Sequence, residues 1–171
     1  SCRWRLRSHM PERFTTSPTA ATTIIRPLAI SGGVVRRRTA CQQMTAAMAT
    51  ICAVLHHKMP AYLWTGFYFV DGENELHVGP YQGPVACQVL RDRGVCLHCA
   101  RTKQPIVVPD VHQFPGHIAC DARSKSEIVL PVMKGDEVIA VLDVDSDKLA
   151  QFDEDDVAPL ARILGLLQPY L

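Results

Sequence analysis

The stretch EIVLPVMKGDEVIAVLDVD, residues 127–145, predicts a β-hairpin from which the rest of the fold can be worked out. Its two arms, residues 127–133 and 138–145, are rich in β-branched side chains, which favour extended strands. Between the arms, Lys134-Gly135-Asp136 supplies the glycine and the polar residues that a tight turn requires. We therefore expect two antiparallel strands that lie side by side.

Further strands are expected on the N-terminal side of this hairpin. Residues 64–70, WTGFYFV, are aromatic and β-branched, and Asp71-Gly72 follows as a turn. Residues 75–79 then form the return strand of a second hairpin. Short strands are also expected at residues 85–90 and 106–108.

Helices are expected at both ends of the chain and once in its middle. Residues 39–58 are rich in Ala and Met, residues 94–103 are compatible with a short helix, and Asp153 is placed to cap a closing helix. Residues 109–126 form a polar loop of a length that is usually functional or disordered. Hairpins with helices at both ends predict an α+β domain, in which helices flank a central, mainly antiparallel sheet.

The formal net charge of +1 conceals two oppositely charged segments. Residues 1–40 contain eight arginines and one acidic residue, which gives +7, whereas the remaining residues sum to −6. An Arg-rich, hydroxyl-rich and acid-poor segment is typical of an organellar transit peptide, and an untargeted disordered tail is the alternative. We expect a tail over residues 1–35 and a folded domain over residues 36–171, in the cytoplasm or, with a transit peptide, in a mitochondrion or another organelle.

Composition also excludes several classes of protein. An aromatic content of 6% and a charged content of 20% exclude wholesale disorder, and the near-neutral total argues against a dedicated nucleic-acid binder. No apolar run approaches the roughly 18 residues of a membrane-spanning helix. The seven cysteines are odd in number and follow no disulfide framework, which favours a reducing compartment.

One cysteine lies in a segment suited to anion binding. Residues 115–121, PGHIACD, place Cys120 after a glycine-containing turn in the long loop. Successive backbone N–H groups in such a turn can converge on a thiolate or on a substrate carboxylate.

Three carboxylates are expected to converge near one end of the first hairpin. Asp143 and Asp145 are two residues apart on a strand, so both project from one face, and Glu127 begins the partner strand. Converging acids can hold an ammonium group, and their mutual repulsion can raise one pKa enough to make that acid a proton donor near neutral pH. The alternative is an ordinary solvated strand end.

A zinc site is an alternative, because Cys96 and Cys99 have the spacing of half such a site. The chain contains no second paired motif at a suitable spacing, so no metal and no other cofactor is expected. The residues considered for completing the site are His98, His112, His117 and Cys120.

A series of short blocks resembles the free methionine-(R)-sulfoxide reductases, whose fold is a GAF domain. The similarity covers roughly residues 40–168, in order and at the family spacing. The blocks are WTGFY at 64–68, GPYQG at 79–83 continuing to Cys87, RGVC at 93–96, PDVH at 109–112, FPGHIACD at 114–121, residues 124–131, VIAVLDVDS at 138–146 and FDEDD at 152–156.

The resemblance implies thioredoxin-dependent reduction of free, not protein-bound, methionine-(R)-sulfoxide. By similarity, the Cys120 thiolate attacks the sulfoxide sulfur and becomes a sulfenic acid, which a second thiol resolves. Cys87 and Cys96 are the resolving candidates. The sequence departs from the family at Leu97-His98-Cys99, where small residues are usual, so Cys99 competes for that role.

The same resemblance assigns the substrate's groups to particular residues. The ammonium group is expected to meet the acids Glu127, Asp143 and Asp145, one of which protonates the sulfoxide oxygen. The carboxylate is expected on backbone N–H groups near Ile118, Ala119 and Cys120. Trp64 and Tyr68, on one strand face, either wall the S-methyl group or simply pack beneath the sheet.

The main rival is a non-catalytic GAF sensor of a small molecule. Such sensors normally belong to multidomain chains, and we expect no room for an output domain here. Three cysteines spaced for a reductive cycle also favour the enzyme. Family members are often dimeric, so a homodimer is possible.

Overall fold

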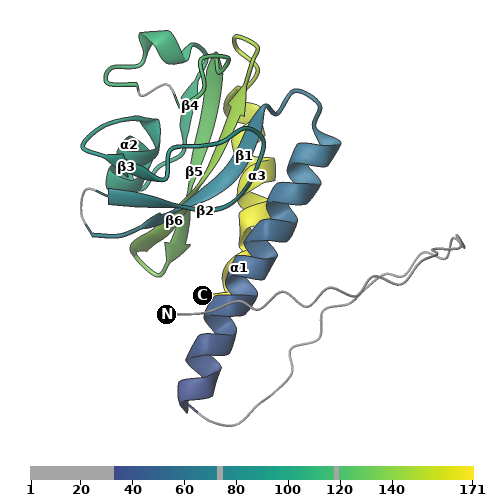
Figure 1. The fold of residues 1–171 in the computed structure, drawn as a ribbon, viewed down its shortest axis with the longest axis vertical. Helices are drawn as coiled ribbons and strands as arrows, with labels where there is room; N and C mark the ends of the chain where they lie inside the picture. Colours follow the sequence, from purple (N-terminus) through teal and green to yellow (C-terminus); the bar gives the residue numbers. More distant parts are fainter. Residues whose placement is uncertain (1–32, 73–74, 118–119) are drawn as a thin grey trace, which may run out of the picture. The chain divides into compact units, whose positions relative to one another are not determined.

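Six antiparallel strands form one sheet in the part of the chain that the computed structural model describes, namely residues 33–72, 75–117 and 120–171 (Figure 1). Their order across the sheet is β3-β2-β1-β6-β5-β4, and each neighbouring pair is antiparallel. The expected α+β class is confirmed. The strands are β1 (Trp64–Val70), β2 (Glu75–Gln82), β3 (Val89–Arg91), β4 (Ile106–Val108), β5 (Ser126–Lys134) and β6 (Glu137–Ser146).

The hairpin expected over residues 127–145 is confirmed as β5 and β6, in the middle of the sheet. Gly135 has a φ of +60° at the turn, a conformation that glycine adopts without strain. The hairpin expected over residues 64–79 is confirmed as β1 and β2. The strand expected at residues 85–90 is shorter than predicted, because Gly83, with a φ of +116°, turns the chain toward Leu63 and Trp64 and away from the sheet edge.

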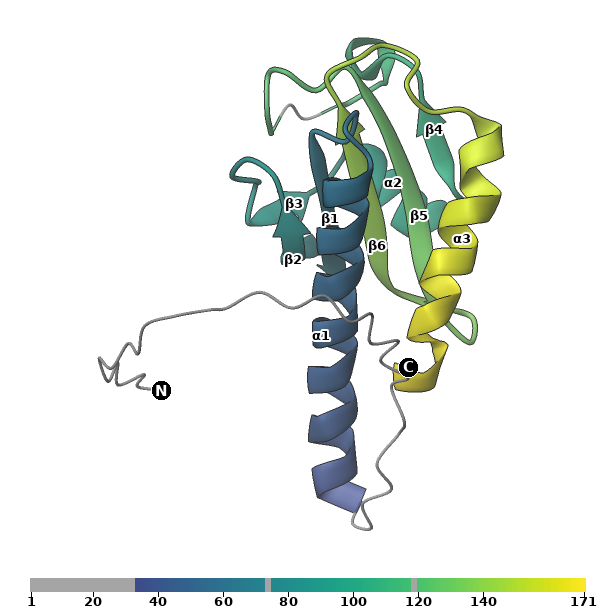
Figure 2. The ribbon, with the colours of Figure 1, turned by 90° about the vertical axis from the view of Figure 1, so that its right-hand side faces the viewer.

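One face of the sheet is covered by α1 (Gly33–Lys58) and α3 (Val157–Leu164), which Figure 2 shows on the same side. Side chains alternate between the two faces along β5 and β6, and the aliphatic residues on this face pack against the two helices. The short 3₁₀ helices η2 (Glu154–Asp156) and η3 (Gly165–Tyr170) flank α3. Buried residues of this layer include Met48, Ile51, Cys52, Phe67, Ile128, Leu130, Leu142, Val144, Leu160 and Leu167.

The opposite face carries α2 (Val95–Thr102) and the 3₁₀ turn η1 (Val111–Gln113) of the long loop. A second apolar cluster lies beneath them and includes Trp64, Tyr68, Leu76, Val95, Leu97, Val111, Val129 and Val141. The two faces therefore differ in the residues they carry, because the cysteines and acids predicted for the site all lie on the α2 side.

The starts of two helices can be compared with those that the sequence predicts. Asp153 is confirmed as a cap, with its carboxylate accepting from the backbone N–H of Asp155 and a reciprocal contact from Asp156. The first helix begins at Gly33 and not near residue 39; the added turns include Arg36, Arg37 and Arg38, and arginine is a good helix former. In the described part of the chain, no helix is long and apolar enough to cross a membrane.

Candidate active site

Three neighbouring strands place chemically active side chains in one row. Trp64 of β1 lies opposite Asp145 of β6, and Asp145 lies opposite Glu127 of β5. One step along, Gly66 faces Asp143, which stands two residues from Asp145 on the same face of the sheet. The convergence of the three acids that the sequence predicts is therefore confirmed, and the solvated strand end is wrong.

Two of these acids are buried and the third is half-buried, and among the described residues none of the three forms an ion pair with a basic side chain. Glu127 and Asp143 are only 5% and 7% exposed. Burial, followed by repulsion from the neighbouring acids, holds the pKa of Glu127 and that of Asp143 well above the ordinary carboxyl range. Burial raises the pKa of Asp145 to about 6. These carboxyls therefore hold their protons to a higher pH than ordinary acids do, and they can donate those protons or lose them to a bound cation.

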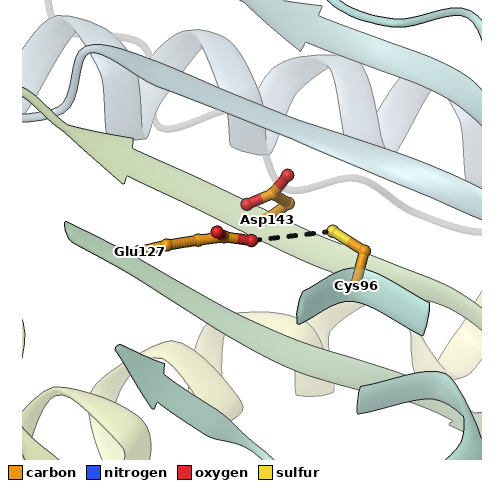
Figure 3. A group of neighbouring side chains, drawn as sticks. All are labelled: Cys96, Glu127 and Asp143. Atoms are coloured by element: carbon orange, nitrogen blue, oxygen red, sulfur yellow. Dashed lines mark hydrogen bonds between the residues drawn. The ribbon is translucent and has the colours of Figure 1, made fainter. Parts of the chain in front are cut away.

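The thiol of Cys96 belongs to this acid cluster. Cys96 is the second residue of α2, is 3% exposed, and donates to Glu127 Oε1 across 3.9 Å (Figure 3). Burial and the nearby Asp143 carboxyl raise its pKa well above that of a free thiol. Cys99, one turn further along α2, instead contacts the carbonyl oxygen of Val129 at 3.7 Å and is fully buried.

Cys120 and Cys87 form a separate pair of thiols. The Cys120 thiol lies within hydrogen-bonding reach of both the side chain and the backbone of Cys87. Cys120 is exposed as a residue, yet its thiol is partly enclosed, and this burial raises its pKa to about 12. The hydroxyl of Tyr68 donates to the carbonyl oxygen of Cys87 at 3.1 Å, which fixes the Cys87 segment against the sheet.

An aromatic stack forms the wall beside the acids. Trp64 lies between Tyr68 and Tyr81, with ring centroids 5.6 and 5.4 Å away and interplanar angles of 29° and 21°. The indole crosses Gly66, where an added Cβ would come within 2.3 Å of Trp64 Cη2. Gly66 is thus required by the close approach of the ring.

A single pocket joins most of these groups. Of the ten residues predicted for the site, seven line it, namely Trp64, Tyr68, Cys96, Cys120, Glu127, Asp143 and Asp145. Cys87 adjoins it through Cys120. Ile118 and Ala119 lie outside the described residues, so the expected backbone contacts remain predictions.

The pocket also contains residues to which the sequence analysis gave no role. Ser124 Oγ donates a hydrogen bond to Asp145 Oδ1, and Arg93 and His117 lie on the lining. The side-chain carbons of Arg93 pack against Gly116, whose added Cβ would lie 3.3 Å from Arg93 Cδ. The sequence could have indicated Ser124, which stands three residues before Glu127 in the chain. No sequence pattern indicates that Arg93 belongs to the pocket.

The alternative zinc site built on Cys96 and Cys99 is not supported. Among the described residues, the groups with metal-ligand spacing comprise one cluster, Cys96 with Glu127 and Asp143. Cys99 does not belong to it, because its thiol faces the backbone of β5.

Comparison with known proteins identifies related chains. A family model described as a GAF domain matches residues 41–168. "GAF domain-containing protein A" of Dictyostelium discoideum is 51% identical over 123 residues, which cover 71% of this chain and 77% of that protein. The "Free methionine-R-sulfoxide reductase" of Escherichia coli is 39% identical over 127 residues, which cover 74% of this chain and 76% of the bacterial protein.

A solved structure of a free methionine-R-sulfoxide reductase is also similar to this chain. The free methionine-R-sulfoxide reductase of Neisseria meningitidis, in complex with its substrate, superposes with a TM-score of 0.71 and is 34% identical. The match covers 85% of this chain and 95% of the Neisseria chain.

Proposed function

We propose that this chain, which belongs to the GAF-domain family of free methionine-(R)-sulfoxide reductases, reduces free L-methionine-(R)-sulfoxide to L-methionine. The family and the GAF fold are those that the sequence blocks predict. One observation carries the proposal: a thiol, Cys120, shares a pocket with three buried carboxyls and an aromatic wall. A small zwitterionic sulfoxide requires this combination of groups.

The acids and the aromatic wall can orient the substrate. The ammonium group of the amino acid compensates the charge of Glu127, Asp143 and Asp145, none of which forms an ion pair within the described residues. Trp64 bounds the space for the S-methyl group. A peptide-linked methionine sulfoxide has no free ammonium group, so these acids would remain unpaired and that substrate would be rejected.

Arg93 supports binding of the opposite end of the substrate. It lines the same pocket as the acids and is exposed, as expected for a side chain at the pocket edge. A guanidinium suits a carboxylate because it offers paired N–H donors. We assign the substrate carboxylate to Arg93 together with the backbone N–H groups expected near residues 118–120.

The chemical step transfers oxygen from one sulfur to another. Cys120 Sγ attacks the sulfoxide sulfur, the sulfoxide oxygen is protonated by a pocket carboxyl, and the oxygen passes to Cys120 as methionine leaves. The products are methionine and a sulfenic acid, Cys–SOH, so the thiol supplies the electrons. Burial raises the pKa of Cys120 to about 12, so in this proposal the thiol gives up its proton as the sulfur–sulfur contact forms, to the pocket carboxylate that has protonated the sulfoxide oxygen.

Cys87 is the resolving thiol that the geometry favours. It lies next to Cys120, whereas Cys96 is buried and bonded to Glu127. Condensation of the sulfenic acid with the Cys87 thiol forms a disulfide and releases water. A dithiol reductant of the thioredoxin type then restores both thiols by exchange.

The deciding experiment is turnover of defined substrates. The reduced protein is mixed with free L-methionine-(R)-sulfoxide and either dithiothreitol or thioredoxin with its reductase, and methionine is quantified. Turnover is expected with the R epimer and not with the S epimer or with N-acetylmethionine-(R)-sulfoxide. Cys120→Ser is expected to be inactive, and Cys99→Ala, a buried thiol outside the pocket, serves as the matched control. Undiminished turnover in Cys120→Ser would transfer the attack to Cys96.

A further inference from the structure

The buried end of the pocket holds three potential metal ligands close together. Cys96 offers a sulfur, and Glu127 and Asp143 each offer a carboxylate oxygen, with all three atoms within 4.8 Å of one another. Figure 3 shows the three side chains pointing toward one another from α2, β5 and β6. None of the three is more than 7% exposed.

The spacing of one pair of these atoms is close to that in a tetrahedral metal site, and all three lie within 4.8 Å of one another. With metal–sulfur and metal–oxygen bonds of about 2.3 and 2.0 Å, a tetrahedral zinc site has a sulfur-to-oxygen edge of about 3.5 Å. The distance from Cys96 Sγ to Glu127 Oε1 is 3.9 Å. A contraction of a few tenths of an ångström would bring this pair to the required spacing, a movement within the range of side-chain rotation.

A buried atom without a hydrogen-bond partner supports a ligand at this cluster. Asp143 Oδ1 is buried and has no hydrogen-bond partner, although the carboxyl itself interacts with Cys96 and Glu127. A buried polar atom without a partner is costly, and acids gathered in this way repel one another. Both features call for a cation at this position.

The donor set selects among cations. Two carboxylates alone would suit a hard ion such as Mg²⁺, but a thiolate sulfur favours Zn²⁺ and similar borderline ions. We propose that Cys96, Glu127 and Asp143 form an inhibitory Zn²⁺ site that overlaps the position of the substrate's ammonium group. On binding, each protonated ligand releases its proton to solvent, and the ion takes over the charge compensation that the ammonium group provides. The overlap with the ammonium position rests on the proposed function, whereas the metal site itself does not.

Cobalt is the probe that reports ligation directly. Titration of the reduced protein with Co²⁺ is expected to yield one bound ion and a thiolate-to-cobalt charge-transfer band in the near ultraviolet. Added Zn²⁺ should abolish the band by displacement. The band should be lost in Cys96→Ser and retained in Cys99→Ala, which removes a thiol one turn away on the same helix. Circular dichroism checks that each variant is folded.

A second pair of variants separates this site from the neighbouring thiols. The double variant Cys87→Ser/Cys120→Ser should retain the band, and Glu127→Gln should weaken Co²⁺ binding at least tenfold while leaving the Cys96 thiol in place. Loss of the band in the double variant would overturn the proposal by moving the metal to Cys87 and Cys120. Absence of any band in the wild-type protein would also overturn it.

Substrate competition tests the overlap separately. Methionine-(R)-sulfoxide is expected to raise the apparent dissociation constant of Co²⁺ in proportion to its concentration, and Zn²⁺ to inhibit turnover competitively. Because the cobalt band requires no turnover, an inactive protein that binds Co²⁺ would contradict only the proposed function. An active protein that does not bind Co²⁺ would contradict only the metal site.

Discussion

The thiol of Cys96 is bonded to Oε1 of Glu127 at 3.9 Å, at the buried end of the pocket. Cys120 instead lies beside Cys87, whose carbonyl is fixed by the hydroxyl of Tyr68. The two thiols that the family resemblance treats as equivalent partners of Cys120 therefore have different surroundings. Cys87 lies where it can form a disulfide with Cys120, whereas Cys96 lies where its thiol hydrogen-bonds to the acid Glu127.

This difference predicts separable kinetic effects of two single substitutions. With thioredoxin as reductant, Cys87→Ser should release about one methionine per protein and then stop, since the sulfenic acid has no adjacent thiol. Cys96→Ser should continue through many turnovers. A time course of methionine formation measures both. The opposite pattern, with Cys96→Ser stopping after one turnover, would make Cys96 the resolving thiol.

The hydrogen bond from Ser124 to Asp145 predicts a shift in the pH profile. This bond lowers the pKa of Asp145 against the effect of burial, so Ser124→Ala should raise that pKa above about 6. If ionised Asp145 binds the substrate's ammonium group, the acidic limb of kcat/KM should move to higher pH. Loss of a bond to a charged group should also reduce kcat/KM by roughly 10-fold or more. An unmoved limb would contradict this role for Ser124.

Arg93 is expected to act on substrate binding and not on chemistry. Arg93→Ala should raise KM by about tenfold with little change in kcat, because in the proposed role the guanidinium would hold the carboxylate equally in the ground and transition states. Arg93→Lys should recover part of the loss. Steady-state kinetics with free methionine-(R)-sulfoxide measures both variants, and a fall in kcat alone would be inconsistent with carboxylate binding.

Gly66→Ala tests the close approach of the aromatic wall. The new Cβ would lie 2.3 Å from Trp64 Cη2 and 2.5 Å from Tyr81 Cβ, so the indole must move. We expect a loss of about 1–3 kcal/mol in the free energy of unfolding, measured by urea denaturation. KM should also rise. Gly165→Ala, with open space around it and a φ of −56°, is the control and should change stability little.

The raised pKa of Asp145 predicts that the empty protein becomes less stable as pH rises. Below its ordinary pKa of 3.8 the carboxyl is protonated in both the folded and unfolded states, so it contributes no pH dependence. The folded state holds this proton more tightly than the unfolded state does, and it loses the proton only above a pKa of about 6. The free energy of unfolding should therefore be roughly 2–3 kcal/mol lower above that pH than below the ordinary pKa.

Urea denaturation between pH 4 and pH 8 measures this change. Asp145→Asn should flatten the part of the curve between the two pKa values. The remaining decline at higher pH should come from Glu127 and Asp143, whose pKa values are also raised. A stability that rises with pH across this range would contradict the burial of uncompensated acids.

Local sequence patterns were sufficient where the physical cause is itself local. The period of two along a strand predicted that Asp143 and Asp145 share a face, and the turn at Gly135 placed Glu127 on the neighbouring strand. The cap at Asp153 was predicted for the same reason, since a carboxylate and the N–H groups it accepts from are adjacent in the chain. The extent of the strand expected at residues 85–90 was not predicted, because it depends on Gly83, which turns toward Leu63, a residue distant in sequence.

The amino-acid sequence by itself determined the hairpins, the acid-bearing face and the identity of the reactive residue types, because side-chain alternation and turn chemistry act over a few residues. Only the tertiary structure decided that Cys87 accompanies Cys120, that Cys96 joins Glu127, and that Arg93 reaches the pocket. These relationships connect α2, the long loop and three strands, and their distances depend on how the layers pack. The same cysteine spacing is compatible with several pairings until that packing is known.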